Sequence, residues 1–142
     1  MIRVDWQIRI ERTAEDVFDF VADLRNEPQF NPDASDVQQL TPGPIGLGTV
    51  YAETFRGLGQ YRTTIDHFER PTALGFAARH PRADANVEFR FTPAGESATD
   101  VSCTVGLRMK GAMRLAEPAM APTIRKQIEH SRGPMLKQAL ES

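Results

Sequence analysis

The stretch MRLAEPAMAPTIRKQIEHSRGPMLKQAL, residues 113–140, decides the fold that we expect for this chain. Its apolar residues recur at steps of four or seven, the spacing that places side chains on one face of an α-helix. They are Met113, Met120, Ile124, Ile128, Met135 and Ala139. Charged residues such as Arg125, Glu129 and Arg132 fall mostly off that face. Because such a helix is stabilised by packing rather than by itself, the rest of the chain must supply a partner surface.

The prolines of this stretch modify the expectation of one long helix. Pro118 and Pro122 fit near a helix start, whereas Gly133-Pro134 lies in the middle of the pattern. Proline inside a helix removes a backbone hydrogen bond and clashes with the preceding turn. We therefore expect a kink at Gly133-Pro134, or a separate last segment.

Most of the chain before residue 113 shows the period-two alternation that is typical of β-strands. The first such segment alternates apolar and polar residues from Ile2 to Ile10. Six further strand segments are predicted at residues 37–40, 49–56, 60–69, 73–79, 87–91 and 101–109, with a polar turn at 80–85. Turn signals such as Gly57-Leu58-Gly59 separate them, and their regular spacing indicates a mostly antiparallel sheet.

Two short helices are expected after the first strand. Thr13 is placed to cap a helix whose first turn carries Glu15 and Asp16, as the positive end of a helix favours. The segment from Pro28 to Pro32 allows only a short helical turn. The whole chain, residues 1–142, then reads as a single α+β domain: a curved antiparallel sheet of about seven strands around a long C-terminal helix.

Length and composition narrow the class of protein. A chain of 142 residues with 40% hydrophobic and 25% charged residues fits one ordinary globular domain. A net charge of -2 gives no basic surface for nucleic acid, and one cysteine excludes an internal disulfide framework. No apolar run has the roughly 20 residues that span a bilayer, and no signal peptide is evident. We expect a cytoplasmic protein, a monomer or homodimer without an integral membrane segment.

Particular motifs carry a resemblance to a known family. They are the segment from Thr13 to Leu24 after the opening strand, Phe30-Asn31-Pro32, Gly48 before a strand, Phe68-Glu69-Arg70-Pro71, and the closing Leu136 to Glu141. With this element order the chain resembles the START-like superfamily, the helix-grip fold of the polyketide cyclase/dehydrase and lipid-transport families and of the birch-pollen-allergen type. The resemblance spans nearly the whole chain and implies an elongated apolar cavity between sheet and helix. Members use that cavity for lipids, hormones, aromatic polyketides or partner proteins, so the fold does not choose a function.

Strand parity predicts which side chains face such a cavity. The expected apolar wall comprises Phe55, Ile65, Phe76, Val87, Phe89, Phe91, Val101, Cys103, Val105, Leu107 and Met109, opposite Met120, Ile124, Ile128 and Met135. The alternative is that these side chains fill a closed core, as aromatic residues and methionines at such spacings usually do.

Polar groups share the faces of the middle strands. Tyr51 and Glu53 are in one strand segment, and Tyr61, Thr63 and His67 are in the next. A polar group that points into an apolar pocket must find a partner or shift its pKa, which marks these residues as ligand contacts. Tyr61 and His67 are the preferred pair. One bulge would reverse the parity, and for His67 the alternative is an exposed or hydrogen-bonded strand histidine.

The remaining chemistry-bearing residues give weaker signals. Arg56 and Arg62 flank the central hairpin, where they are placed to bind a ligand carboxylate or, alternatively, to pair at the surface with Glu53 or Asp66. No His/Asp/Glu cluster indicates a metal site, and no motif indicates a cofactor.

Three functions fit this sequence. The first is binding of a small hydrophobic or amphipathic ligand, lipid-like or aromatic, between sheet and C-terminal helix. The second is a polyketide cyclase/dehydratase-type enzyme in which Tyr61, His67 and Arg56 position a poly-β-keto chain and move a proton. The third is a protein-interaction module, which a closed interior and a large exposed apolar patch would favour.

Overall fold

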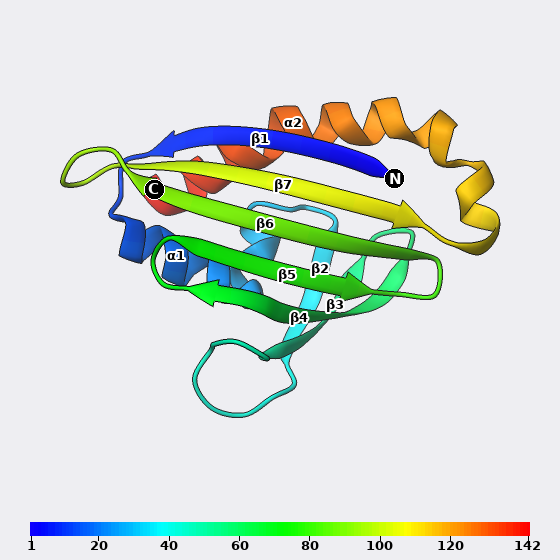
Figure 1. The fold of residues 1–142 in the computed structure, drawn as a ribbon, viewed down its shortest axis with the longest axis horizontal. Coiled ribbons are helices and arrows are strands. Elements are labelled where there is room, and N and C mark those ends of the chain that lie inside the picture. The colour runs from blue at the N-terminus through cyan, green and yellow to red at the C-terminus, as the bar shows by residue number, and fades with distance from the viewer.

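The computed structural model describes residues 1–142 and is organised around a seven-stranded antiparallel sheet in the order β1-β7-β6-β5-β4-β3-β2. The strands are β1 (Ile2–Ile10), β2 (Ala34–Gln39), β3 (Val50–Phe55), β4 (Gly59–Glu69), β5 (Ala73–Arg79), β6 (Ala83–Pro93) and β7 (Thr99–Met109). In Figure 1 the sheet curves, and the long helix α2 (Glu117–Glu141) runs beside β1. The prediction of an α+β helix-grip fold with about seven strands is confirmed.

Strand positions follow the sequence pattern with two differences. Strand β6 begins at Ala83, inside the turn that we expected at residues 80–85, because Ala83 and Ala85 pair with Met109 and Leu107 of β7. Strand β2 begins at Ala34 rather than at residue 37. Its pairing with β3 is interrupted near Asp36, which has a positive φ of 51°.

Both short helices after β1 are present and begin at side-chain caps, although the second lies at Leu24–Gln29 rather than at residues 28–32. Helix α1 (Ala14–Ala22) starts after Thr13, whose Oγ1 accepts a hydrogen bond from the Asp16 backbone N–H at 3.2 Å. The 3₁₀-helix η1 (Leu24–Gln29) follows directly, with the Asp23 carboxylate accepting from the Arg25 N–H. Figure 1 shows α1 at the end of the sheet where β1 ends.

The C-terminal helix is one continuous element, so of the two alternatives that we expected at Gly133-Pro134, a kink or a separate last segment, the separate segment is wrong. A separate 3₁₀-helix η2 (Gly111–Leu115) contains Met113, and α2 runs without interruption from Glu117 to Glu141. Pro134 and His130, whose carbonyl loses its usual partner, are both exposed, so water can replace the missing hydrogen bond. No helix of the structure combines the length and apolarity needed to cross a membrane.

Gly133 has a packing role instead, because it lets α2 approach β1 closely. A Cβ atom at this position would lie 3.2 Å from Ile8 Cβ and 3.5 Å from Trp6 Cε3. In the first half of α2, Arg125 Nε donates to the Arg3 carbonyl, and near its C-terminal end Lys137 Nζ donates to the Arg9 carbonyl. The helix is therefore attached along the edge strand of the sheet.

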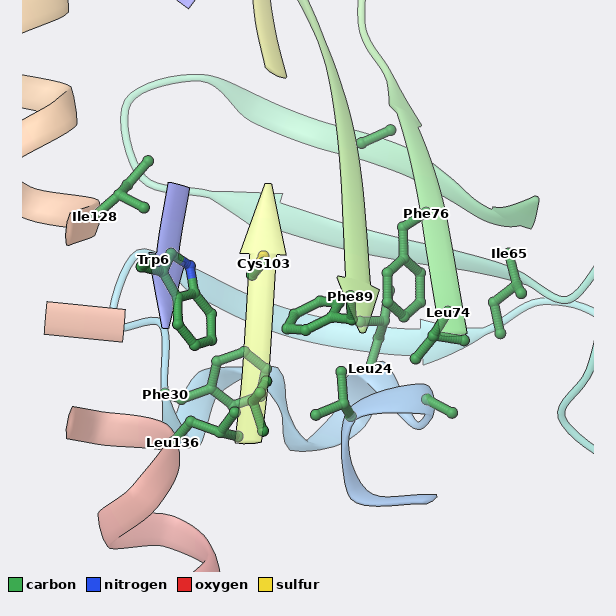
Figure 2. Packing of buried hydrophobic residues seen from close by; sticks show 14 of the residues in the cluster. Trp6, Leu24, Phe30, Ile65, Leu74, Phe76, Phe89, Cys103, Ile128 and Leu136 are labelled. Atoms are coloured by element: carbon green, nitrogen blue, oxygen red, sulfur yellow. The ribbon is translucent and has the colours of Figure 1, made fainter. Parts of the chain in front are cut away.

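The core lies between the inner face of the sheet and the helices. Trp6, Cys103, Phe89 and Leu74 are successive cross-strand neighbours on β1, β7, β6 and β5, and all four are buried. Trp6 and Phe89 meet edge to face with ring centroids 5.9 Å apart, a favourable aromatic geometry. Figure 2 shows this row, with Ile128 and Leu136 of α2 on the Trp6 side.

Replacing Gly133 by a larger residue should destabilise the protein. In Gly133→Val the new side chain would meet Ile8 and Trp6, and such overpacking typically costs about 1–3 kcal/mol. We expect a lower midpoint in chemical denaturation with an unchanged m-value. Glu129→Val places the same side chain on the exposed face of α2 and should cost much less. Equal effects of the two substitutions would show that the close approach is not needed.

Candidate ligand-binding site

A cavity of about 490 Å³ lies between the concave face of the sheet and α2. This volume is within the range of about 300–1,000 Å³ that small-molecule sites occupy. Its wall is mostly apolar, and it is built from β1, η1, the central strands and the first two-thirds of α2. The interior is thus hollow rather than filled. Of the two alternatives that the sequence left open, a cavity and a closed core, the structure has the cavity.

Most residues predicted to face the cavity do line it. They are Glu53, Phe55, Arg56, Tyr61, Thr63, Phe76, Val87, Phe89, Cys103, Val105, Leu107, Met109, Met120, Ile124 and Ile128. The alternating strands β6 and β7 supply the apolar wall, and the four-residue steps of α2 supply the opposite side. That these residues contact a ligand stays a prediction.

Three predicted contacts lie elsewhere in the core. Tyr51 is fully buried, and its hydroxyl donates to the Ala22 carbonyl at the end of α1, at 3.0 Å. Phe91 packs on Phe18 of α1 with ring centroids 5.6 Å apart, and Ile65 is buried outside the cavity lining. The structural reason is that α1 and η1 cover this end of the sheet. Val101 and Met135 do not line the cavity either.

The expectation that His67 faces the cavity is wrong. The pairing of β4 with β5 shifts between Ile65 and His67, and this bulge reverses the parity of the residues that follow. Phe68 therefore points inward and packs on Phe18 at a centroid distance of 5.0 Å. His67 instead lies beside Glu88 and Glu69, with its two ring nitrogens 2.5 and 3.1 Å from their carboxylates. Hydrogen bonding to Glu88 and Glu69 raises the pKa of His67, as a surface ion cluster would.

A buried carboxylate dominates the polar part of the cavity. The Glu53 side chain is 1% exposed, and its Oε1 accepts a 2.7 Å hydrogen bond from Thr63 Oγ1. Its other oxygen, Oε2, is buried and has no hydrogen-bond partner apart from the Glu27 carboxyl group, which can donate to Glu53 when it is protonated. Removal from water raises the pKa of Glu53, because burial disfavours the charged form.

Two further cavity residues, Glu27 and Asn31, lie beside Glu53 and were missed from the sequence. Glu27 comes from η1, and its Oε2 accepts a hydrogen bond from Asn31 Nδ2 at 3.2 Å. Burial, and then the negative charge of Glu53, raise the pKa of Glu27 well above its ordinary value. The two carboxyl groups thus favour a state in which Glu27 keeps its proton. Neither residue lies in a periodic segment, although Asn31 is in the Phe30-Asn31-Pro32 motif.

Arg132 of α2 completes this polar cluster, which we define as Glu27, Asn31, Glu53, Thr63 and Arg132. Arg132 lines the cavity, and burial lowers its pKa against the opposing charges of Glu27 and Asp33. It continues the four-residue step of Ile124 and Ile128, a spacing that assigns it to the inner face in spite of its charge. The four-residue spacing in the sequence therefore indicated Arg132 as an inward-facing residue, and we did not predict it only because it is charged.

The other polar candidates lie at the border of the cavity. Tyr61 lines it between Phe55, at a ring distance of 5.0 Å, and His80, which stacks on it at 4.6 Å. Burial raises the pKa of Tyr61. Arg56 is 79% exposed and lies 4.0 Å from Asp33 rather than near Glu53. Arg62 is exposed on β4 and does not line the cavity.

This arrangement can bind an apolar molecule and anchor a polar group at one place. The apolar wall disfavours water, and the polar cluster offers the Glu53 carboxyl group, the Arg132 guanidinium and the Glu27 carboxyl group, whose raised pKa favours its protonated form. No group of three or more His, Cys, Asp or Glu residues is placed to hold a metal ion.

Comparison with known families gives one match. Residues 1–135 match the family described as "Polyketide cyclase / dehydrase and lipid transport". No curated protein sequence matches this chain.

Solved structures share the fold at low sequence identity. A conserved protein from Geobacillus kaustophilus superposes with a TM-score of 0.74 at 13% identity, covering 99% of this chain and 95% of that one. The Zhui aromatase/cyclase from Streptomyces sp. R1128 gives 0.73 at 14% identity, with 97% and 90% coverage. A START superfamily protein from Mycobacterium smegmatis gives 0.71 at 13% identity, with 99% and 98% coverage. The START-like resemblance found in the sequence is confirmed.

The raised pKa of Glu27 predicts a pH-dependent loss of stability. Above the ordinary value of 4.5, the unfolded chain releases a proton that the folded protein keeps, so stability falls as pH rises toward the native pKa. Glu27→Gln removes this effect and keeps an acceptor for Asn31. We expect the variant and the wild type to unfold alike near pH 4, and the variant to be the more stable of the two near pH 8.

Urea denaturation at several pH values measures this difference. Glu96→Gln, at an exposed position in the turn after β6, is the matched control and should show no pH-dependent difference. If the curves of stability against pH for Glu27→Gln and the wild type run parallel, Glu27 ionises normally in the folded protein.

Proposed function

Because the chain belongs to the polyketide cyclase/dehydrase and lipid transport family, we propose that it binds a small amphipathic ligand in the cavity under α2. The observation that carries this proposal is the cavity itself, an apolar hollow of about 490 Å³ with one polar cluster on its wall. An interior that served stability alone would be packed to the density of a normal protein core. The hollow therefore supports a role in holding a ligand.

Apolar contact would supply most of the binding free energy. Burying about 200 Å² of ligand surface contributes roughly 5 kcal/mol before ordering costs, which with a few polar contacts is enough for micromolar affinity. Phe76 and Phe89 both line the cavity, and their rings meet edge to face with centroids 6.3 Å apart, so an aromatic ligand would find ring partners in this wall.

A catalytic role is the second candidate, and one observation favours it. The raised pKa of Glu27 favours its protonated form next to Glu53, and such a pair can supply the acid and the base that proton transfer at a bound substrate requires. In a dehydration, the carboxylate would remove a proton next to a carbonyl, and the carboxylic acid would protonate the departing hydroxyl, which leaves as water. His67 has no part in this version, because it lies on the outer face of the sheet. Turnover of an aromatic β-hydroxy ketone, measured by ultraviolet absorbance of the conjugated product, tests it.

The interaction-module alternative has less support. A closed interior and a large exposed apolar patch would favour an interaction module, whereas the interior of this protein is hollow. The large exposed apolar residues, Met1, Leu40, Leu47 and Leu115, lie in separate segments.

Filling the cavity should abolish binding. Thermal shift with fatty acids, sterols, flavonoids and polyketide-like aromatics finds ligands, and the best one is then titrated calorimetrically. In Val105→Trp the indole occupies the hollow beside Cys103 and Leu107, so we expect affinity to fall at least about tenfold. Arg108→Trp places the same ring on the outer face of β7 and should leave affinity unchanged. Undiminished binding by a folded Val105→Trp would place the ligand elsewhere.

A further inference from the structure

The net charge of -2 conceals an uneven distribution of charge over the molecule. Three segments meet at the end of the sheet where β1 begins: the β3–β4 hairpin, the turn between β5 and β6, and the end of β7 with η2 (Figure 1). The Lys110 backbone N–H donates to the Arg82 carbonyl at 2.9 Å, and Arg82 Nη2 donates to the Leu58 carbonyl at 2.6 Å, so hydrogen bonds join the three segments. We call residues 56–62, 79–84 and 108–117 together the basic end.

The basic end is rich in cationic side chains that no acidic residue neutralises. It holds seven of the 17 Lys and Arg residues of the chain but only two of its 19 Asp and Glu residues. Both acidic residues have cationic partners, because Asp84 lies 3.3 Å from Lys110 and Glu117 lies 3.0 Å from the N-terminal ammonium group. Five exposed arginines, by contrast, form no ion pair with a carboxylate. They are Arg62, Arg79, Arg82, Arg108 and Arg114.

An apolar side chain projects from the same end. Leu115, the last residue of η2, is 88% exposed, more than any other large apolar residue of the chain. In Figure 1 the yellow-gold segment that contains η2 lies beyond the end of β7. Leu115 directly follows Arg114. Exposed apolar and basic side chains together are the combination that binds at the boundary between lipid headgroups and acyl chains.

The cavity reaches the basic end as well. Its wall includes Leu58 of the β3–β4 hairpin, Asp84 near the start of β6 and Met113 of η2. Arg56 and Gly57 also belong to the wall and are exposed, so the hollow approaches the molecular surface at this hairpin. A surface that binds the basic end therefore lies next to the cavity.

The side chains of the basic end select among anionic partners. A nucleic acid would attract the arginines, but it offers no apolar phase for Leu115, and the basic end has no exposed aromatic ring on which bases could stack. An acidic protein would also attract them, but the aromatic anchors that dominate protein interfaces are absent there. An anionic bilayer suits both features, since its phosphates accept hydrogen bonds from guanidinium groups and its acyl chains receive the leucine.

We infer that the basic end docks on the surface of an anionic phospholipid membrane, with its arginines among the headgroup phosphates and Leu115 at the edge of the acyl chains. This peripheral contact goes beyond the proposed function and does not require a ligand in the cavity. Because the whole chain is negatively charged, its attraction to an anionic surface depends on the uneven distribution of its charge.

Cosedimentation of the full chain with vesicles tests this docking. One set of vesicles is phosphatidylcholine alone, and the other contains equal parts of phosphatidylcholine and phosphatidylglycerol. We expect binding to the anionic vesicles at least about tenfold tighter than to phosphatidylcholine. Raising the salt concentration from about 0.1 to about 1 M shortens the Debye length from about 10 to about 3 Å and should remove most of this preference.

Matched variants assign the contact to the basic end. Arg114→Gln should weaken binding to anionic vesicles about fivefold, whereas Arg12→Gln makes the same charge change at the opposite end of the sheet and should leave it nearly unchanged. Leu115→Ser should weaken binding about tenfold, because the leucine no longer enters the lipid. Leu47→Ser, at an exposed leucine in the loop between β2 and β3, should have no effect. All four positions are exposed, and circular dichroism confirms that each variant is folded.

Each other outcome contradicts the proposal in a different way. Equal binding to the two kinds of vesicle, or no binding to the anionic ones, overturns membrane docking. Equal weakening by Arg114→Gln and Arg12→Gln overturns the assignment to the basic end. If Leu115→Ser binds vesicles as the wild type does, and double-stranded DNA or poly-L-glutamate binds more tightly than the vesicles, the basic end is a site for a nucleic acid or an acidic protein and the membrane proposal fails.

Discussion

The attachment of α2 to the edge strand β1 is the contact on which the rest of the structure depends. Gly133 allows the helix to lie against Trp6 and Ile8, and Arg125 and Lys137 tie it to β1 backbone carbonyls. Because the helix is fixed along this edge, its inner face extends over the concave sheet without filling it. The cavity is thus a consequence of where the helix is anchored, and the strands β3 to β7 become its wall.

The polar cluster lowers the stability of the fold but is suited to ligand binding. Glu27 and Glu53 bring two carboxyl groups into an apolar interior, and burial raises the pKa of both. A core selected for stability alone would hold apolar side chains of similar volume at these positions. The hydrogen bonds from Asn31 and Thr63 fix both carboxyl groups in place, which is the preorganisation that recognition of a polar ligand group requires.

The sequence pattern predicted the fold well and the apolar wall almost as well, whereas it failed at His67 and Tyr51. Alternation along β6 and β7 continues without a register shift, so parity placed Val87, Phe89 and Val105 correctly. In β4 one bulge exchanges the faces of His67 and Phe68, and a bulge has no signature in hydropathy. Tyr51 faces inward as expected, but α1 covers it, and its hydroxyl donates a hydrogen bond to the Ala22 carbonyl of that helix.

By itself the sequence determined the elements and their order, because the spacing of apolar residues is a property of chain neighbours that sets the buried face of each strand and helix. Only the tertiary structure decided that the interior is hollow and that Glu27, Glu53 and Arg132 meet there. These three residues come from η1, β3 and α2, far apart in the chain. Their distances depend on how closely α2 approaches β1 and on how η1 turns back over the sheet, which no local pattern encodes.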